Sequence, residues 1–255
     1  MKNSWLSIIL SLSVTAFIGM SVSAQTASTD LKRASLKVTD IFAKVEDSLK
    51  KEFATKALAY PPKEIFVRSF KYDRQLEVWV KNSEGDQFKL FKSYKVCLQS
   101  GTIGPKRMQG DYQVPEGFYY INEFNPNSNY HLSLGLNYPN ASDRVLSDPQ
   151  RPGGDIYIHG SCASTGCIPI TDGPIEELYV LASRVKEAGQ EFIPVHIFPI
   201  KYNQKKSAEY LEQATKDNEA LQQFSNNLKV AYDYFEEKKK LPVILVSKKG
   251  QYIVQ

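Results

Sequence analysis

The stretch 158-IHGSCASTGCIPI-170 decides the fold and the chemistry predicted for this chain, because it places one histidine and two cysteines within nine residues. A thiol attacks a carbonyl only as its thiolate, so it needs a nearby base, and His159 is the obvious partner. A glycine directly before a nucleophile permits a tight turn and frees amide N–H groups to face an oxyanion. Gly166 gives Cys167 that setting, so the pattern favours Cys167 over Cys162 as the nucleophile.

Two other interpretations of these residues stay open on chemistry alone. The two cysteines have C-x4-C spacing and could form a disulfide. Together with His159 they could also supply part of a metal site. A zinc site needs three or four ligands, and no second cluster of Cys or His completes one, so neither a metal nor a cofactor is predicted.

The first residues predict a cleaved signal peptide over 1–24. A lysine at position 2 precedes the apolar run Trp5 to Met20, and Val22-Ser23-Ala24 has the small-x-small pattern of a cleavage site. An uncleaved membrane anchor is the alternative, but the run is short and serine-rich for a spanning helix. We therefore expect an exported, soluble mature chain of about 230 residues.

Charge and cysteine count limit the function classes. The net charge of +4 is mild and shows no clustered basic stripe, so nucleic acid is not predicted as a partner. Three cysteines in an exported chain leave at least one thiol unpaired.

Residue patterns in the first half predict one helix followed by strands. Apolar residues recur at helical spacing over 34–57, before Pro61-Pro62. Strands are predicted over 64–70 and, around a turn at 83–86, within 75–96. A glycine-punctuated loop is predicted over 100–121. A further strand is predicted over 129–139, with His131 on the face opposite its leucines.

The second half continues this mixed pattern. A strand is predicted over 155–160, a helix over 174–188, and a strand over 192–200 whose prolines place it at an edge or bend. One long helix or a helix pair is predicted over 203–240, before one or two short strands. The expected domains are an N-terminal helical segment at 25–60, a mostly β catalytic domain at 61–201 and a C-terminal helical extension at 202–255.

Three ordered segments together resemble one known family. Ser164-Thr165-Gly166-Cys167, preceded by His159-Gly160, is similar to the S-x-G-C active-site signature of L,D-transpeptidases with a YkuD-type catalytic domain. The segment 104–119 resembles the loop and strand that these enzymes place upstream. The segment 124–140 resembles the YafK-like branch. The resemblance covers about residues 64–200 and implies an α+β, mostly β domain with flanking helices.

The resemblance also implies an activity, acyl transfer on peptidoglycan stem peptides. Together with the predicted signal peptide it implies a periplasmic or cell-wall-associated location. Cys167 would be the nucleophile and His159 the base, with a thioester intermediate. The backbone around Gly160, Ser164, Thr165 and Gly166 would shape the turn and hold the oxyanion. An amine of a second stem, a lysine of a wall-linked lipoprotein, or water would then resolve the thioester.

Two features depart from the commoner members of the family. The eight positions from His159 to Cys167 form a shorter gap, which fits the YafK-like branch. Most members have an arginine two residues after the cysteine, and Pro169 stands at that position here. One of three basic residues in nearby loops is therefore predicted to hold the substrate carboxylate in its place: Lys106, Arg107 or Arg144.

The remaining histidines and cysteines have separate predictions. His131 is predicted to face the substrate or to support the site, and His196 to be structural. Cys97 is predicted as a buried free thiol in an apolar strand, with a Cys97–Cys162 disulfide as the alternative in an oxidising compartment.

Three rival functions stay open beside the transferase. A hydrolase of the same fold would use the same thioester and release wall-linked protein or peptide. A wall-binding module would have no need of His159 and Cys167. A thiol-redox protein does not fit C-x4-C spacing without a thioredoxin-like βαβ pattern.

Overall fold

A computed structural model describes residues 36–255 of the chain. The predicted signal peptide lies outside these residues. A helix spans residues 36–55, where one was predicted, and its buried residues include Val45, Leu49 and Phe53. Within residues 36–255, no helix has the length and apolar character needed to cross a membrane.

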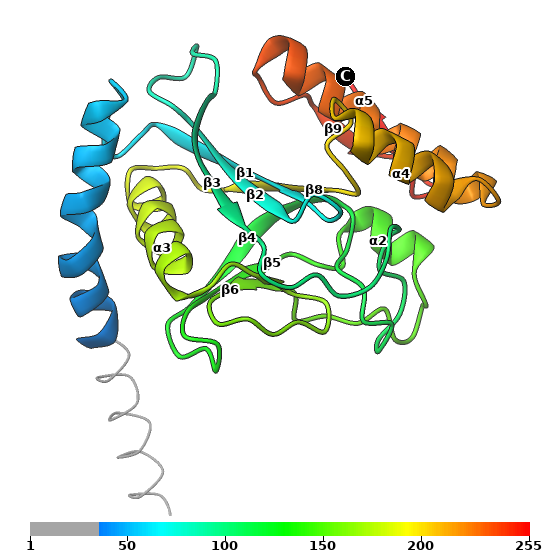
Figure 1. Cartoon of the computed structure of the whole chain (residues 1–255), viewed down its shortest axis with the longest axis horizontal. Helices are drawn as coiled ribbons and strands as arrows, with labels where there is room; N and C mark the ends of the chain where they lie inside the picture. The colour runs from blue at the N-terminus through cyan, green and yellow to red at the C-terminus, as the bar shows by residue number, and fades with distance from the viewer. Residues whose placement is uncertain (1–35) are drawn as a thin grey trace, which may run out of the picture. The chain divides into compact units, whose positions relative to one another are not determined.

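A mixed eight-stranded sheet forms the centre of the unit made by residues 44–255 (Figure 1). Its strands are β1 (Glu64–Phe70), β2 (Gln75–Lys81), β3 (Lys89–Lys95), β4 (Gly117–Asn125), β5 (Ser133–Leu136), β6 (Tyr157–His159), β7 (Ile168–Pro169) and β8 (Pro194–Phe198). Their order across the sheet is β3-β2-β1-β8-β4-β5-β6-β7. The first half of β4 pairs with β8 and its second half with β5, with an irregularity between Ile121 and Glu123. This one strand therefore joins the hairpin half of the sheet to the half that ends in β6 and β7.

Strand β8 lies in the middle of the sheet, parallel to β1 and antiparallel to β4. The prediction of an edge or bend for this strand is wrong. Proline removes a ladder hydrogen bond only where its missing N–H would donate. Pro194 is the first residue of β8 and Pro199 follows its last residue, so the prolines bound a central strand.

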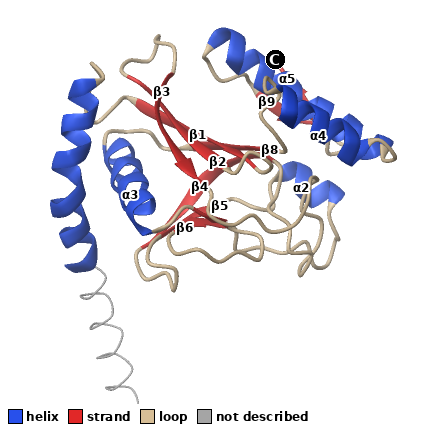
Figure 2. Ribbon diagram, in the orientation of Figure 1, coloured by secondary structure: helices blue, strands red, loops and turns tan. Residues whose placement is uncertain are grey.

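Helices cover both faces of the sheet (Figure 2). Helix α3 (Asp172–Glu187) contacts β1, β5 and β6. On the other face, Phe235 and Tyr232 of α5 (Glu219–Lys238) pack on aromatic residues of β1, with ring centroids 5.0 Å apart for Phe66 and Phe235. Helix α4 (Lys205–Thr215) precedes α5, which confirms the predicted helix pair. Because β1 is covered on both sides, almost all of its residues are buried.

The remaining elements are short. Helix α2 (Ala141–Leu146) follows β5, and β9 (Ile244–Val246) and β10 (Tyr252–Val254) form a hairpin against α5. The α+β, mostly β fold class is confirmed.

Two predictions about local structure are wrong. The predicted loop at 100–121 includes the start of β4, because the aromatic run from Phe118 continues the strand. The predicted strand at 129–139 forms only as β5. His131 lies before it with a left-handed φ of 75°, so it is not on a strand face.

Candidate active site

The motif at residues 158–170 contributes to two adjacent parallel strands and forms the loop between them. In β6 and β7, Ile158 lies opposite Ile168 and His159 opposite Pro169. Continuing this register backwards places Cys167 beside Tyr157. Side chains two residues apart point to the same face of a sheet, so Cys167 and His159 share one face as diagonal neighbours.

One cavity of about 320 Å³ contains both candidate catalytic side chains. Its lining comes from the end of β4 and the segment after it, from the start of β5, from β6 and the residues before it, and from the motif loop: Asn125, Asn127, Ser128, Asn129, Tyr130, Ser133, Asp155, Tyr157, His159, Thr165 and Cys167. The predicted pairing of His159 with Cys167 in one site therefore has a geometric basis, and Thr165 belongs to the same wall.

The imidazole of His159 is held in one orientation. Its Nδ1 lies 2.6 Å from the carbonyl oxygen of Gly160, so Nδ1–H donates and the neutral ring leaves Nε2 as the acceptor. The Tyr130 ring lies over the imidazole with centroids 4.6 Å apart. Burial lowers the pKa of His159 below its ordinary value, so the ring is neutral at physiological pH and able to take a proton.

Cys167 is the one free cysteine among the described residues, which include all three cysteines of the chain. Its Sγ lies 3.4 Å from the backbone oxygen of Asp155. Burial is the main cause that raises the pKa of this thiol, and the Asp155 carboxylate adds to it. The thiol is therefore protonated at rest, and a base is needed to form the thiolate.

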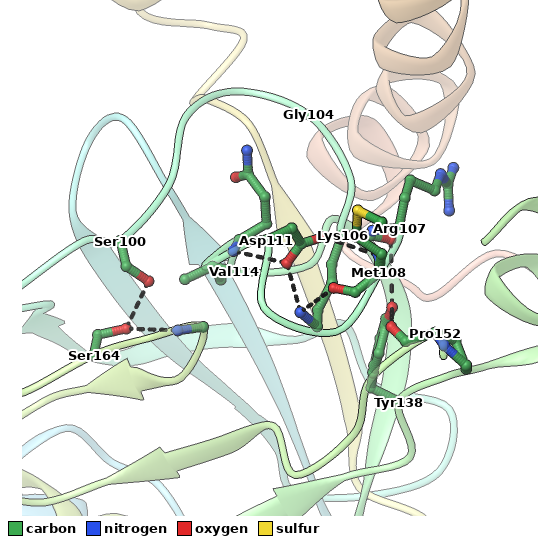
Figure 3. A network of polar contacts seen from close by, with 12 residues as sticks. Ser100, Gly104, Lys106, Arg107, Met108, Asp111, Val114, Tyr138, Pro152 and Ser164 are labelled. Atoms are coloured by element: carbon green, nitrogen blue, oxygen red, sulfur yellow. Dashed lines mark hydrogen bonds and ion pairs between the residues drawn. The ribbon is translucent and has the colours of Figure 1, made fainter. Parts of the chain in front are cut away.

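A serine-centred turn fixes the backbone that bears Cys167. The Ser164 hydroxyl donates to the Cys167 carbonyl at 2.7 Å and accepts from the Gly166 amide at 3.2 Å. It also pairs with the Ser100 hydroxyl at 2.9 Å (Figure 3). The Gly166 amide is thus engaged in this turn, so it would have to leave Ser164 to reach an oxyanion.

The two glycines of the motif stand where a side chain has no room. Gly166 has a φ of 140°, and a Cβ there would lie 3.1 Å from a backbone oxygen. At Gly160 a Cβ would lie 2.6 Å from Oδ1 of Asp172, which accepts the Ser161 amide. Glycine therefore permits both ends of the loop to close.

Cys97 and Cys162 form a disulfide. The alternative pairing given by the sequence is confirmed, and the predictions of a free thiol at Cys97 and of its place in a strand are wrong, since β3 ends at Lys95. The bond joins the segment after β3 to the loop between His159 and Cys167. It also leaves Cys162 without a thiol, so of the two motif cysteines Cys167 is the one with a free thiol.

Lys106 lies behind the cavity and does not line it. Its Nζ donates to Oδ1 of Asp111 at 2.5 Å and to the Met108 carbonyl at 2.9 Å (Figure 3). It also packs against Gly153, where a Cβ would lie 2.8 Å from the lysine Cε. Its charge lowers the pKa of Cys167, which marks it as a neighbour of the nucleophile.

The other basic candidates point elsewhere. Arg107 pairs with Asp143 at 3.2 Å and lies over the Phe224 ring of α5, beside a separate cavity of about 570 Å³. Arg144, on α2, donates to the Pro139 carbonyl at 3.2 Å. Neither residue contacts the cavity that contains Cys167, so a role in holding a substrate carboxylate stays a prediction without a contact behind it.

His131 also turns away from the cavity. Its Nε2 lies 2.8 Å from Glu176 of α3, which is bound in addition by Lys44. Its substrate-facing role likewise stays a prediction. His196, predicted as structural, is buried on β8 among Phe66 and Phe118, and desolvation lowers its pKa to about 3.

Sequence reasoning missed the residues that form most of the cavity wall. The polar segment 125–129, Tyr130 and Asp155 come from loops, where no periodic pattern marks a functional side chain. The Gly153-Gly154-Asp155 segment shortly before β6 was the available signal, since glycine and aspartate are typical of irregular segments between strands.

Comparison with known proteins decides the family. The model of the YkuD L,D-transpeptidase catalytic domain matches residues 68–197. The chain is also 34% identical over 206 residues to a protein of Escherichia coli K12 named "Putative L,D-transpeptidase YafK", with 80% of this chain and 78% of that protein covered. The chain belongs to the YkuD family of L,D-transpeptidases. The predicted family and its YafK-like resemblance are confirmed, and the chain is a peptidoglycan-related enzyme.

Solved structures resemble this YkuD chain more distantly. The helical cell shape determining protein Pgp2 of Campylobacter jejuni is 19% identical, with 72% of this chain and 73% of Pgp2 covered and a TM-score of 0.42. Bd1075 of Bdellovibrio bacteriovorus is 18% identical, with 74% and 79% covered and a TM-score of 0.41.

Proposed function

We propose that this protein is a cysteine-dependent acyl transferase acting on peptidoglycan stem peptides, with Cys167 as nucleophile and His159 as base. The observation that supports this most directly is the shared cavity. It contains a free thiol and an imidazole whose Nδ1 is tied to the Gly160 carbonyl, which leaves Nε2 to accept a proton.

The proposed reaction begins from a neutral thiol and a neutral imidazole. As the sulfur attacks the carbonyl carbon of the stem-peptide diamino acid, Nε2 of His159 takes the thiol proton. The tetrahedral intermediate collapses when the imidazolium returns that proton to the leaving amine, which expels the terminal D-amino acid. Cys167 is then joined to the donor peptide as a thioester.

The second half of the reaction frees the enzyme. An amine from a second stem, or from a wall-linked lipoprotein, attacks the thioester while His159 takes its proton, and the thiol leaves with that proton. Water in place of the amine would give hydrolysis through the same intermediate. The chemical identity of the acceptor therefore determines whether the protein cross-links stem peptides or hydrolyses the thioester and releases the donor peptide.

The test is to incubate the purified protein with disaccharide-tetrapeptides and with lipoprotein-linked sacculi, and to identify products by mass spectrometry. Cross-linked dimers are expected for a transferase, and released peptide or lipoprotein alone for a hydrolase. Cys167→Ala and His159→Gln should abolish both products. Lys248→Ala, at the exposed tip of the β9–β10 hairpin, should act as wild type.

A covalent probe tests the nucleophile separately from turnover. A carbapenem should acylate Cys167, as read from peptide mass spectrometry. Full activity in Cys167→Ala, or acylation that persists in that variant, would contradict the proposed mechanism.

A further inference from the structure

Asp155 is the charged group at the wall of the Cys167 cavity. It lies in the irregular segment before β6 with a left-handed φ of 56°, after Gly153 with a φ of 89°. The side chain is exposed. Within residues 36–255 its carboxylate has no hydrogen-bond or ion-pair partner. Its backbone carbonyl is the group that lies against the thiol.

The rest of the cavity lining has no positive charge to balance this carboxylate. The remaining residues bear amides, hydroxyls, the Cys167 thiol and the neutral imidazole of His159, and the described lining includes neither lysine nor arginine. Lys106, whose charge acts on the nucleophile, is buried and already bound to Asp111. The lining of the cavity therefore carries a net negative charge, which attracts cationic groups.

This charge does not help the nucleophile. A carboxylate beside a thiol opposes thiolate formation, and here its effect adds to that of burial. A left-handed backbone at a residue other than glycine also costs free energy. An exposed, unpartnered carboxylate on a left-handed residue in the lining of this cavity is better explained by a ligand than by activation of Cys167.

We propose that Asp155 is a specificity-determining residue whose carboxylate binds a primary ammonium group of the donor peptide. This inference rests on the proposed function and adds the feature of the substrate that the cavity selects. In a stem peptide the group that fits is the free side-chain amine of the diamino acid whose carbonyl is attacked. A charge-assisted N–H···O bond to it fixes the donor beside Cys167.

The experiment compares two donors and three proteins. The donors are a disaccharide-tetrapeptide with a free side-chain amine and the same peptide N-acetylated at that amine. The proteins are wild type, Asp155→Asn, and Asp217→Asn as a matched control in the exposed turn between α4 and α5. The readout is the initial rate of release of the terminal amino acid, resolved into kcat and KM.

The rise in KM caused by acetylation of the donor and the rise caused by Asp155→Asn are expected not to add. In wild type, acetylation raises KM by about tenfold or more, as expected for loss of a hydrogen bond between charged groups. Asp155→Asn raises KM for the free amine by a similar factor and shows almost no further change on acetylation. Asp217→Asn behaves as wild type.

Two outcomes overturn the inference. Asp155→Asn could leave KM for the free amine unchanged, or the two losses could multiply instead of replacing each other. Iodoacetamide alkylation of Cys167 in Asp155→Asn should be as fast as in wild type or faster, which shows an intact thiol. Loss of turnover on Cys167→Ala tests the proposed function independently, so either idea can fail alone.

Discussion

Removing the Cys97–Cys162 disulfide should destabilise the protein strongly while leaving the candidate nucleophile in place. The bond joins residues 65 positions apart. The chain-entropy relation for a loop of that length gives about 4 kcal/mol at 25 °C. For a domain of this size, 1 kcal/mol corresponds to a change of about 2–4 °C in Tm, so a loss of roughly 8–16 °C is expected.

The variant that tests this is the double substitution Cys97→Ser with Cys162→Ser. Each single variant leaves a second free thiol, at Cys162 or at Cys97, and that thiol could exchange with the nucleophile. Thermal and urea unfolding would be followed by circular dichroism with and without a thiol reductant. Cys167→Ser is the matched control, because it removes a cysteine without removing a cross-link.

Three results together would support the reasoning. The double variant should lose stability, its Tm should not respond to reductant, and wild type in reductant should approach the Tm of the double variant. Equal Tm values for wild type and the double variant would refute it. They would mean either that the cysteines are not paired or that the segment after β3 and the motif loop are ordered together without the bond.

Three further changes have expected outcomes. Gly166→Ala should lower turnover about a hundredfold, because it forces a side chain into a left-handed position and displaces the thiol. Gly85→Ala is the control and should leave turnover unchanged, because Gly85 has open space around it. Lys71→Met should cost about 3–5 kcal/mol of unfolding free energy in urea, since it leaves the fully buried carboxylate of Glu116 without its partner 3.0 Å away; adding Glu116→Leu should recover much of that loss. The acid limb of kcat/KM should lie below pH 6.5, because burial lowers the pKa of the base His159, and a limb above pH 7 would contradict a neutral resting imidazole.

The elements with a strong local pattern were predictable from the sequence. The hairpin of β2 and β3 surrounds a turn rich in glycine and acidic residues, and α3 has apolar residues at helical spacing before Gly189. The candidate pair His159 and Cys167 was predictable because a short motif contains both residues. Local patterns give elements and motifs because the signals lie within a few neighbouring residues.

Long-range pairing was much less predictable. The prolines of β8 indicate an edge by local rules, but their places at the strand ends allow a central position between β1 and β4. Cys97 pairs with Cys162 across a long separation that periodicity cannot reveal. The basic residues Arg107 and Arg144 lie near the motif segments in sequence, yet the fold directs them to α5 and to the Pro139 carbonyl.

Pro169 and Asp155 together explain the charge around Cys167, because the first position is uncharged and the second carries a carboxylate. The register places Pro169 opposite His159 in β7. Proline is buried there, and its carbonyl accepts the Cys97 amide at 3.0 Å, so the strand end is tied to the disulfide segment. A cation at this position would lie on the same face as the imidazole, would lower the pKa of His159 further and would offset the negative charge of Asp155. Its absence leaves the Asp155 carboxylate available to a substrate. Pro169→Arg should therefore weaken the preference for a free amine in the donor, while Pro169→Ala should leave that preference as in wild type.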